Sequence, residues 1–261
     1  MGIQSASLNV MRAAAEKAGR ALRRDFGEIE KLQVSQKGPG DFVTNADLKA
    51  ESIIREELQT ARPGYGLLME ESGEIEGSDK THRWIVDPLD GTTNFMHGIP
   101  YFAISIALER EGRLVSGLIY NPVTDELFLA ERGQGAFSHN TRLRVGGRSR
   151  MSDAVFACGA PHGERAGRNE FITEMETLLP KVAGIRRFGA AALDLAYVAA
   201  GRVDGFWERG LAPWDMAAGI VICREAGGLV SDTKNGSKFF ETGEVVAANE
   251  ALHGDLLKNL A

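Results

Sequence analysis

A stretch of alternating apolar and polar residues, FAISIALEREGRLVSGLIYNP at 102–122, limits the folds open to this chain more than any other segment. The alternation runs on both sides of Glu111-Gly112, and a glycine-containing break between two such runs is typical of an antiparallel hairpin. The run DELFLAE at 125–131 continues the pattern. The sequence therefore predicts an antiparallel sheet in the first half of the chain.

Helical patterns precede this sheet. Apolar residues recur at helical spacing over 8–26, and a second helix is expected to begin at Thr44 or Asn45 and to end near Ala61. A Gly/Pro-containing segment at 36–42 predicts a loop between the two helices.

The second half of the chain alternates between strands and helices. The expected order is a strand from Ala154, a helix at 169–179, a strand at 185–188, a helix at 190–200, a strand at 203–208, a helix at 215–226, two short strands and a helix from Asn249. No linker or repeat separates the halves. Hairpins followed by alternating units favour a mixed α+β fold of layered sheets and helices. We expect one domain over 1–261, with a metal-site lobe at 1–150 and an alternating lobe at 151–261.

Composition excludes several classes of protein. A net charge of −6 and a pI near 5.5 argue against unspecific binding to nucleic acid or to anionic membranes. The two cysteines, Cys158 and Cys223, are far apart in apolar contexts, which indicates buried thiols in a reducing compartment. The longest apolar stretch, 102–108, is too short to cross a bilayer, and no signal-peptide pattern begins the chain. A cytoplasmic protein without a membrane partner is expected.

Two aspartates follow directly on a short apolar run in WIVDPLDGTTNF, at 84–95. Crowding the carboxylates of Asp87 and Asp90 would raise a pKa or reduce stability, and a divalent cation would remove that conflict. An all-oxygen site without His or Cys points to Mg²⁺ or Mn²⁺, and the Leu89 carbonyl can supply a further oxygen. The five histidines show no spacing typical of a zinc site.

The same stretch has a simpler interpretation, in which Asp87-Pro88 starts a turn and Asp90 caps a helix. That interpretation leaves Gly91-Thr92 unexplained. A glycine lets a ligand approach the backbone closely, and the amides at a helix start can bind an anion. Metal ligands beside such a turn indicate phosphoryl chemistry.

Four motifs resemble those of the inositol monophosphatase family. DPLDGTTNF at 87–95 resembles its D-P-x-D-G-T-x-N signature, and PWDMAAG at 213–219, followed by EAGG, resembles its W-D-x-A-A-G signature. MEES at 69–72 resembles its first ligand segment, and GDFVTNAD at 40–47 its mobile amino-terminal loop. The segment at 189–208 is most similar to the SuhB-type bacterial branch.

The resemblance implies a layered α-β-α-β-α sandwich and a Mg²⁺-dependent phosphomonoesterase that hydrolyses inositol 1-phosphate without a phospho-enzyme. It also implies inhibition by lithium and a homodimer. The resemblance implies that a first metal ion is bound by Glu70, Asp87, the Leu89 carbonyl and Thr92. A second ion would be bound by Asp87, Asp90 and Asp215. A third, weaker ion would be bound by Glu70 and water, with Asp47 nearby.

The resemblance implies further roles at matching positions. The catalytic residues are Glu70, Thr92 and Asp47, with Glu70 and the Thr92 hydroxyl activating the attacking water. The phosphate-binding residues are Gly91 and Thr92. The substrate-binding residues are Asp90, Gly189, Ala190, Ala191 and Glu208.

Each acidic residue also has a purely structural alternative. Glu70 could be solvated at a strand end, and Asp47 fits a capping box with Thr44. Asp215 would favour the dipole of its helix in any protein, and Glu208 could lie on the surface.

Two alternatives for function stay open. Related scaffolds hydrolyse fructose 1,6-bisphosphate, histidinol phosphate or adenosine bisphosphate. SuhB-type proteins are also partners of the transcription machinery, so RNA polymerase is a possible partner, with Arg186-Arg187 and the arginines at 142–150 as candidate surfaces.

Overall fold

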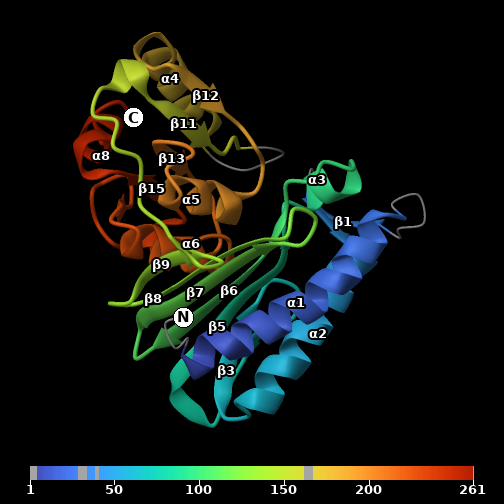
Figure 1. The fold of residues 1–261 in the computed structure, drawn as a ribbon. Coiled ribbons are helices and arrows are strands. Elements are labelled where there is room, and N and C mark those ends of the chain that lie inside the picture. The colour runs from blue at the N-terminus through green and yellow to red at the C-terminus, as the bar shows by residue number, and fades with distance from the viewer. Residues whose placement is uncertain (1–4, 29–33, 39–40, 162–166, 261) are drawn as a thin grey trace.

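The computed structural model describes residues 5–28, 34–38, 41–161 and 167–260 (Figure 1). The helices are α1 (Ala6–Phe26), α2 (Asn45–Ala61), α3 (Thr92–Met96), α4 (Arg168–Leu178), α5 (Ala191–Ala199), α6 (Pro213–Glu225), α7 (Phe239–Thr242) and α8 (Glu250–Leu257). The strands are β1 (Val34–Gly38), β2 (Asp41–Thr44), β3 (Tyr65–Met69), β4 (Gly73–Ile75), β5 (Asp79–Asp90), β6 (Ala103–Arg110), β7 (Arg113–Asn121), β8 (Glu126–Glu131), β9 (Gly135–Ser138), β10 (Thr141–Arg142), β11 (Val155–Cys158), β12 (Gly184–Arg186), β13 (Gly205–Glu208), β14 (Leu229–Ser231) and β15 (Val245–Ala248).

The strands form two main sheets. The larger has eight strands in the order β10-β9-β8-β7-β6-β5-β3-β4, and the smaller has five in the order β12-β11-β13-β15-β14. The hairpin β6–β7 pairs Arg110 with Arg113 across Glu111-Gly112, as its alternating sequence predicts. Within the larger sheet only the β3–β5 pair is parallel among the described strands, so β3 and β5 end at the same edge.

Successive residues of these strands face different cores, and this divides the molecule into layers. Trp84 and Val86 of β5 pack on α1 and α2, whereas Ile85 packs on α5 and α6. In the smaller sheet Phe206 faces α5 and α6, and Trp207 faces the outer core beneath α4 and α8. Figure 1 shows the resulting order: α1 and α2, the larger sheet, α5 and α6, the smaller sheet, then α4 and α8. The expected α-β-α-β-α sandwich is confirmed.

One local prediction is wrong. The loop expected at 36–42 contributes to a two-stranded antiparallel ribbon, because β1 pairs with β2 from Val34–Thr44 inward to Gly38–Asp41. Residues 39–40, which include the start of the segment GDFVTNAD, lie outside the described residues. None of the helices in the described part of the chain is long and apolar enough to span a membrane. The division into two lobes near residue 150 stays a prediction.

Candidate active site

A bulge at the end of β5 orients its two aspartates. Asp87 pairs with Ser105 of β6 and Asp90 pairs with Ala103, so β5 has one more residue than β6 over this interval. Pro88 lies in this interval and has no N–H for the ladder. In a regular strand, residues three apart would point to opposite faces. Because their partners on β6 are two residues apart, Asp87 and Asp90 instead share one face.

Gly91 joins this strand to the short helix α3. Its φ of +92° lies in the left-handed region, and a Cβ there would lie 3.1 Å from the Tyr101 carbonyl and 3.2 Å from Ala190 Cβ. Gly91, not Asp90, is the cap residue of α3. The Asp90 Oδ2 instead accepts a hydrogen bond of 2.7 Å from the Ala192 amide at the start of α5. The interpretation of Asp90 as a helix cap is therefore wrong.

Asp47 forms the predicted capping box and also contacts Thr92. Its Oδ2 accepts hydrogen bonds from the Thr44 amide at 2.8 Å and from the Thr44 hydroxyl at 2.6 Å, which completes the predicted capping box. Its Oδ1 lies 3.0 Å from the Thr92 hydroxyl, whose oxygen is also 3.1 Å from the Leu89 carbonyl. Burial raises the pKa of Asp47. The capping role therefore fixes the carboxylate beside Thr92.

Asp215 reaches the same region from the first turn of α6. Its Oδ2 accepts a hydrogen bond of 2.7 Å from the Ala212 amide, so it caps the helix, and it lies in the first turn, where the structural alternative expects it to favour the helix dipole. The Ser105 hydroxyl of β6 donates to the Trp214 carbonyl at 3.1 Å and ties this turn to the sheet. Asp215 is thereby held close to the end of β5, in addition to stabilising its own helix.

The four acidic residues Glu70, Asp87, Asp90 and Asp215 interact electrostatically. Burial raises the pKa of Asp87 well above its usual range, and the negative charges of Glu70, Asp90 and Asp215 raise it further. Burial and the charge of Asp215 likewise raise the pKa of Asp90, although the Ala192 amide opposes that rise. The crowding expected for Asp87 and Asp90 from the sequence is present, and it extends to Glu70, the residue after β3, and to Asp215 of α6.

The residues expected to bind the substrate alcohol border this cluster. Gly189 has a φ of +93°, and its carbonyl would lie 3.3 Å from a Cβ on Gly91, so the segment Gly189–Ala191 lies against the turn after β5. Glu208 ends β13, and its charge contributes to the raised pKa of Asp90. Its carboxylate packs on Gly159, where a Cβ would lie 1.8 Å from the Glu208 Cδ. Glu208 is half-buried and near the cluster, not isolated on the surface.

Two residues at this site are not among the sequence predictions. Asn94 donates hydrogen bonds from its Nδ2 to the Tyr101 carbonyl at 2.7 Å and to the Phe188 carbonyl at 2.8 Å, which fixes the segment before Gly189. Asp194 of α5 accepts a 2.8 Å hydrogen bond from the Tyr101 hydroxyl, and burial raises its pKa to about 7. An acidic residue in the apolar stretch AAALDLAY was the available signal for Asp194.

The oxygen donors beside one another at this site are of the kind that a hard divalent cation prefers. Across residues 5–28, 34–38, 41–161 and 167–260, no group of three or more His, Cys, Asp or Glu side chains is arranged so that it could hold a metal ion. The donors available beside one another are carboxylate, carbonyl and hydroxyl oxygens, the chemistry that suits Mg²⁺ or Mn²⁺.

Comparisons with known proteins agree with this geometry. The sequence model of the family described as "Inositol monophosphatase family" matches residues 4–261. An inositol-1-monophosphatase of Mesorhizobium japonicum is 61% identical over 98% of this chain and 96% of that protein. The Nus factor SuhB of Escherichia coli K12 is 44% identical over 97% of this chain and 95% of that protein. The crystal structure of the extragenic suppressor protein suhB from Bartonella henselae has a TM-score of 0.95, at 57% identity and 98% coverage of both chains. On the strength of these matches along almost its whole length, the chain belongs to the inositol monophosphatase family.

Proposed function

We propose that this protein is a Mg²⁺-dependent phosphatase that hydrolyses inositol 1-phosphate to inositol and phosphate. The observation that carries the proposal is the meeting of acidic residues from the end of β5, from α6 and from the turn after β3, beside Gly91-Thr92. Its 61% identity to an inositol-1-monophosphatase over nearly the whole chain supports the substrate. A homodimer in the cytoplasm is part of the same proposal, by analogy with the family.

The proposed metal ligands are Glu70, Asp87, the Leu89 carbonyl, Thr92, Asp90 and Asp215, for two to three ions. When bound, Mg²⁺ or Mn²⁺ would neutralise the carboxylates and stabilise charge that develops on the phosphoryl and alkoxide oxygens. Asp87 already has one oxygen fixed by the Leu89 amide at 2.9 Å, and Asp90 has one fixed by Ala192. Each of these two carboxylates therefore keeps an anchor while its other oxygen is available for a cation.

The residues of the chain would position the reactants as follows. Asp47 holds the Thr92 hydroxyl, and Glu70 accepts a proton from the attacking water. The amides of Gly91 and Thr92 bind phosphate oxygens, since the first amides of a helix have no intrahelical acceptor. Glu208 accepts a hydrogen bond from a substrate hydroxyl, and the backbone at Gly189, Ala190 and Ala191 contacts the ring beside Asp90.

Metal-dependent phosphate release tests the proposal. The purified protein should release phosphate from inositol 1-phosphate with Mg²⁺, should lose that activity in EDTA, and should be inhibited by lithium. Asp90→Asn should remove most of the activity while the circular dichroism spectrum stays native. Activity near the wild-type rate in Asp90→Asn at saturating Mg²⁺ would contradict the metal assignment.

The alcohol that is released is tested by a substrate panel. Fructose 1,6-bisphosphate, histidinol phosphate and adenosine bisphosphate are the alternatives to inositol 1-phosphate. Glu208 favours a polyol, since a carboxylate can accept hydrogen bonds from hydroxyl groups. The highest kcat/KM in the panel identifies the substrate, and a preference for any of the three alternatives would replace our proposal.

A second candidate function rests on the 44% identity to a Nus factor SuhB. As such a partner of the transcription machinery, the protein would bind RNA polymerase through exposed arginines, for which Arg186-Arg187 and the arginines at 142–150 are candidates. Pull-down with RNA polymerase, repeated with Asp90→Asn, tests this role. Binding that survives the loss of catalysis would support an independent role, and absence of binding by the wild type would exclude it.

A further inference from the structure

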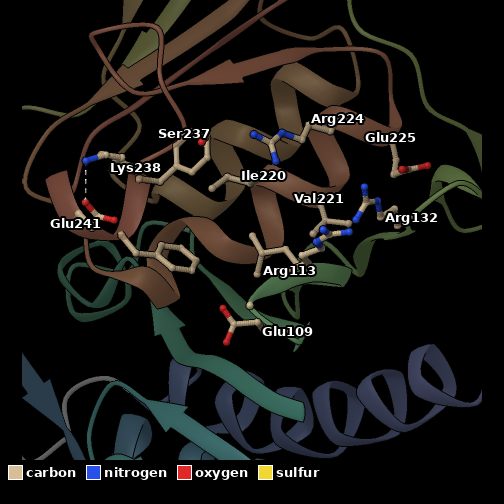
Figure 2. Close-up of a pocket in the computed structure, with 14 residues that line it drawn as sticks. Glu109, Arg113, Arg132, Ile220, Val221, Arg224, Glu225, Ser237, Lys238 and Glu241 are labelled. Atoms are coloured by element: carbon tan, nitrogen blue, oxygen red, sulfur yellow. Dashed lines mark ion pairs between the residues drawn. The ribbon is translucent and has the colours of Figure 1, made fainter. Parts of the chain in front are cut away.

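A pocket of about 530 Å³ lies away from the candidate active site, between the larger sheet and the far end of α6 (Figure 2). It is formed by the β6–β7 hairpin, the residue after β8, the C-terminal half of α6, and α7 with the two residues before it. Its lining residues are Glu109, Gly112, Arg113, Leu114, Arg132, Ile220, Val221, Arg224, Glu225, Ser237, Lys238, Phe239, Phe240 and Glu241. Its volume is within the range of about 300–1,000 Å³ that holds small molecules.

The two sites lie at opposite ends of the same helix. Asp215 is in the first turn of α6, and Arg224 is in its last turn. Arg224 comes nine positions after Asp215, which is about 13.5 Å along the helix axis. None of the residues proposed for catalysis lines the pocket.

Three arginines give the pocket positive charge that the described protein does not neutralise. Arg113, Arg132 and Arg224 all line it, and none of them forms an ion pair within the part of the chain that the structure describes. Figure 2 shows all three side chains on the Val221 side of the pocket, away from the Lys238–Glu241 ion pair. Arg224 lies with its Cζ 5.2 Å from the centre of the Phe239 ring, and its Nη2 donates to the Val230 carbonyl at 3.3 Å.

Two of the three acidic residues of the lining pair with cations, and the third, Glu225, is held by backbone amides and keeps its negative charge. Glu109 pairs with Arg83 outside the pocket, with 2.8 Å between Nη2 and Oε2. Glu225 accepts hydrogen bonds from the amides of Gly133 and Gly135, at 2.9 and 2.8 Å. Glu241 pairs with Lys238 at 3.6 Å.

Arg132 lies close enough to Arg224 to affect its charge. Burial lowers the pKa of Arg224, and the positive charge of Arg132 lowers it further, although Cys223 opposes that fall. Three arginines against the one carboxylate of Glu225 leave this part of the pocket with a net positive charge, which favours the binding of an anion. Guanidinium groups suit phosphate in particular, because their planar donor pattern matches its oxygens.

The rest of the lining is apolar. Leu114 and Phe240 are half-buried and contribute hydrocarbon surface beside the arginines, whereas Ile220, Val221 and Phe239 are buried. A phosphate ion alone would leave the exposed part of Leu114 and Phe240 in contact with water. A ligand that combines a phosphate with a flat apolar ring would cover both parts.

From this juxtaposition we propose a second ligand site, which binds a small phosphorylated molecule with a planar ring, as in a nucleoside monophosphate. Arg113, Arg132 and Arg224 bind the phosphate, and the ring lies on the apolar surface of Leu114 and Phe240. The proposal does not depend on the reaction that the other site catalyses.

Isothermal titration calorimetry with adenosine 5′-monophosphate tests this site. The full chain is titrated in EDTA, so that the probe is not hydrolysed, and at low salt, where phosphate–arginine contacts are strongest. We expect saturable binding of one molecule per chain. Arg113→Gln and Arg132→Gln should each weaken it about tenfold, because each removes a charge-assisted hydrogen bond. Both side chains are exposed, so neither change should unfold the protein.

Arg110→Gln is the matched control, since Arg110 is also exposed and ends β6 but does not line the pocket. Its affinity for the probe should equal that of the wild type. Ribose 5-phosphate and inositol 1-phosphate, which both lack the planar ring, should each bind at least about tenfold more weakly. The proposal is overturned by absence of binding, by equal loss in Arg110→Gln, or by equally tight binding of ribose 5-phosphate or inositol 1-phosphate.

Discussion

Replacing Gly91 by alanine tests whether the tight turn after β5 is required for the reaction. The residue has φ +92° and ψ +36°, where a residue with a Cβ costs about 1–2 kcal/mol. The new Cβ would also meet the Tyr101 carbonyl at 3.1 Å, Ala190 Cβ at 3.2 Å and the Gly189 carbonyl at 3.3 Å. Overpacking of this kind adds about 1 kcal/mol. We therefore expect a loss of about 2–3 kcal/mol in the free energy of unfolding.

This loss should lower the Tm by roughly 5–10 °C. The strain is relieved by moving Gly189 and Ala190 away from the turn, or by moving the turn itself. A misplacement of about 1 Å in a reacting constellation costs on the order of a hundredfold in rate. The measurements are a calorimetric melt and kcat/KM for phosphate release from inositol 1-phosphate, at a temperature below both transitions.

Gly227→Ala is the control for backbone strain alone. Gly227 has φ +89°, but nothing lies within 4 Å of the position of its Cβ. This variant should lose only about 1–2 kcal/mol of stability and keep its full activity. If Gly91→Ala kept the wild-type kcat/KM, or if Gly227→Ala lost activity to the same extent, the close approach of Gly91 to the segment 189–191 would not be what the reaction needs.

Three further predictions concern single side chains of the site. Asp90→Asn should raise the Tm of the protein in EDTA, because it removes one charge from a repelling cluster. Burial and repulsion raise the pKa values of Asp87 and Asp90, so the wild type should lose stability as the pH rises above about 4. In parallel melts over this pH range, the variant should lose less stability than the wild type. Thr92→Val keeps the shape of the side chain but removes the hydroxyl that Asp47 holds. We expect kcat to fall at least about a hundredfold while the Tm stays that of the wild type. An unchanged kcat would exclude a catalytic role for this hydroxyl. Glu208→Gln should raise the KM for inositol 1-phosphate about tenfold with a smaller change in kcat, and the opposite pattern would assign Glu208 to the chemical step.

Local sequence patterns predict most of the elements of this fold, because strand alternation and helical periodicity depend on residues close together in the sequence. The β6–β7 hairpin and α2 follow from such patterns, and the Thr44-x-x-Asp47 spacing predicts the cap of α2. The ribbon β1–β2 does not follow, since its Gly/Pro composition favours a loop and only pairing between the two strands makes it extended. Tertiary pairing overrides local propensity there.

The site is less accessible to sequence reasoning, since its contacts join distant segments. Asp47 touches Thr92 across 45 positions, and the Tyr101 hydroxyl reaches Asp194 across 93. No local pattern encodes such distances. The crowding of Asp87 with Asp90 was predictable because both belong to one strand end, whereas the participation of Asp215 followed only from the family resemblance.

The hydrogen bond from the Ala192 amide to Asp90 has a mechanical consequence. It joins residues 102 positions apart, and it places the start of α5 and the end of β5 on a common anchor. The segment proposed to recognise the substrate alcohol immediately precedes this amide, and the carboxylate that accepts the bond is a proposed metal ligand. A small shift of α5 against the larger sheet would therefore displace the alcohol and Asp90 in the same direction. The substrate alcohol and the proposed metal ligand Asp90 would therefore stay aligned during movements between the layers. Such movements would separate them if the segment before α5 and Asp90 were not joined by this bond.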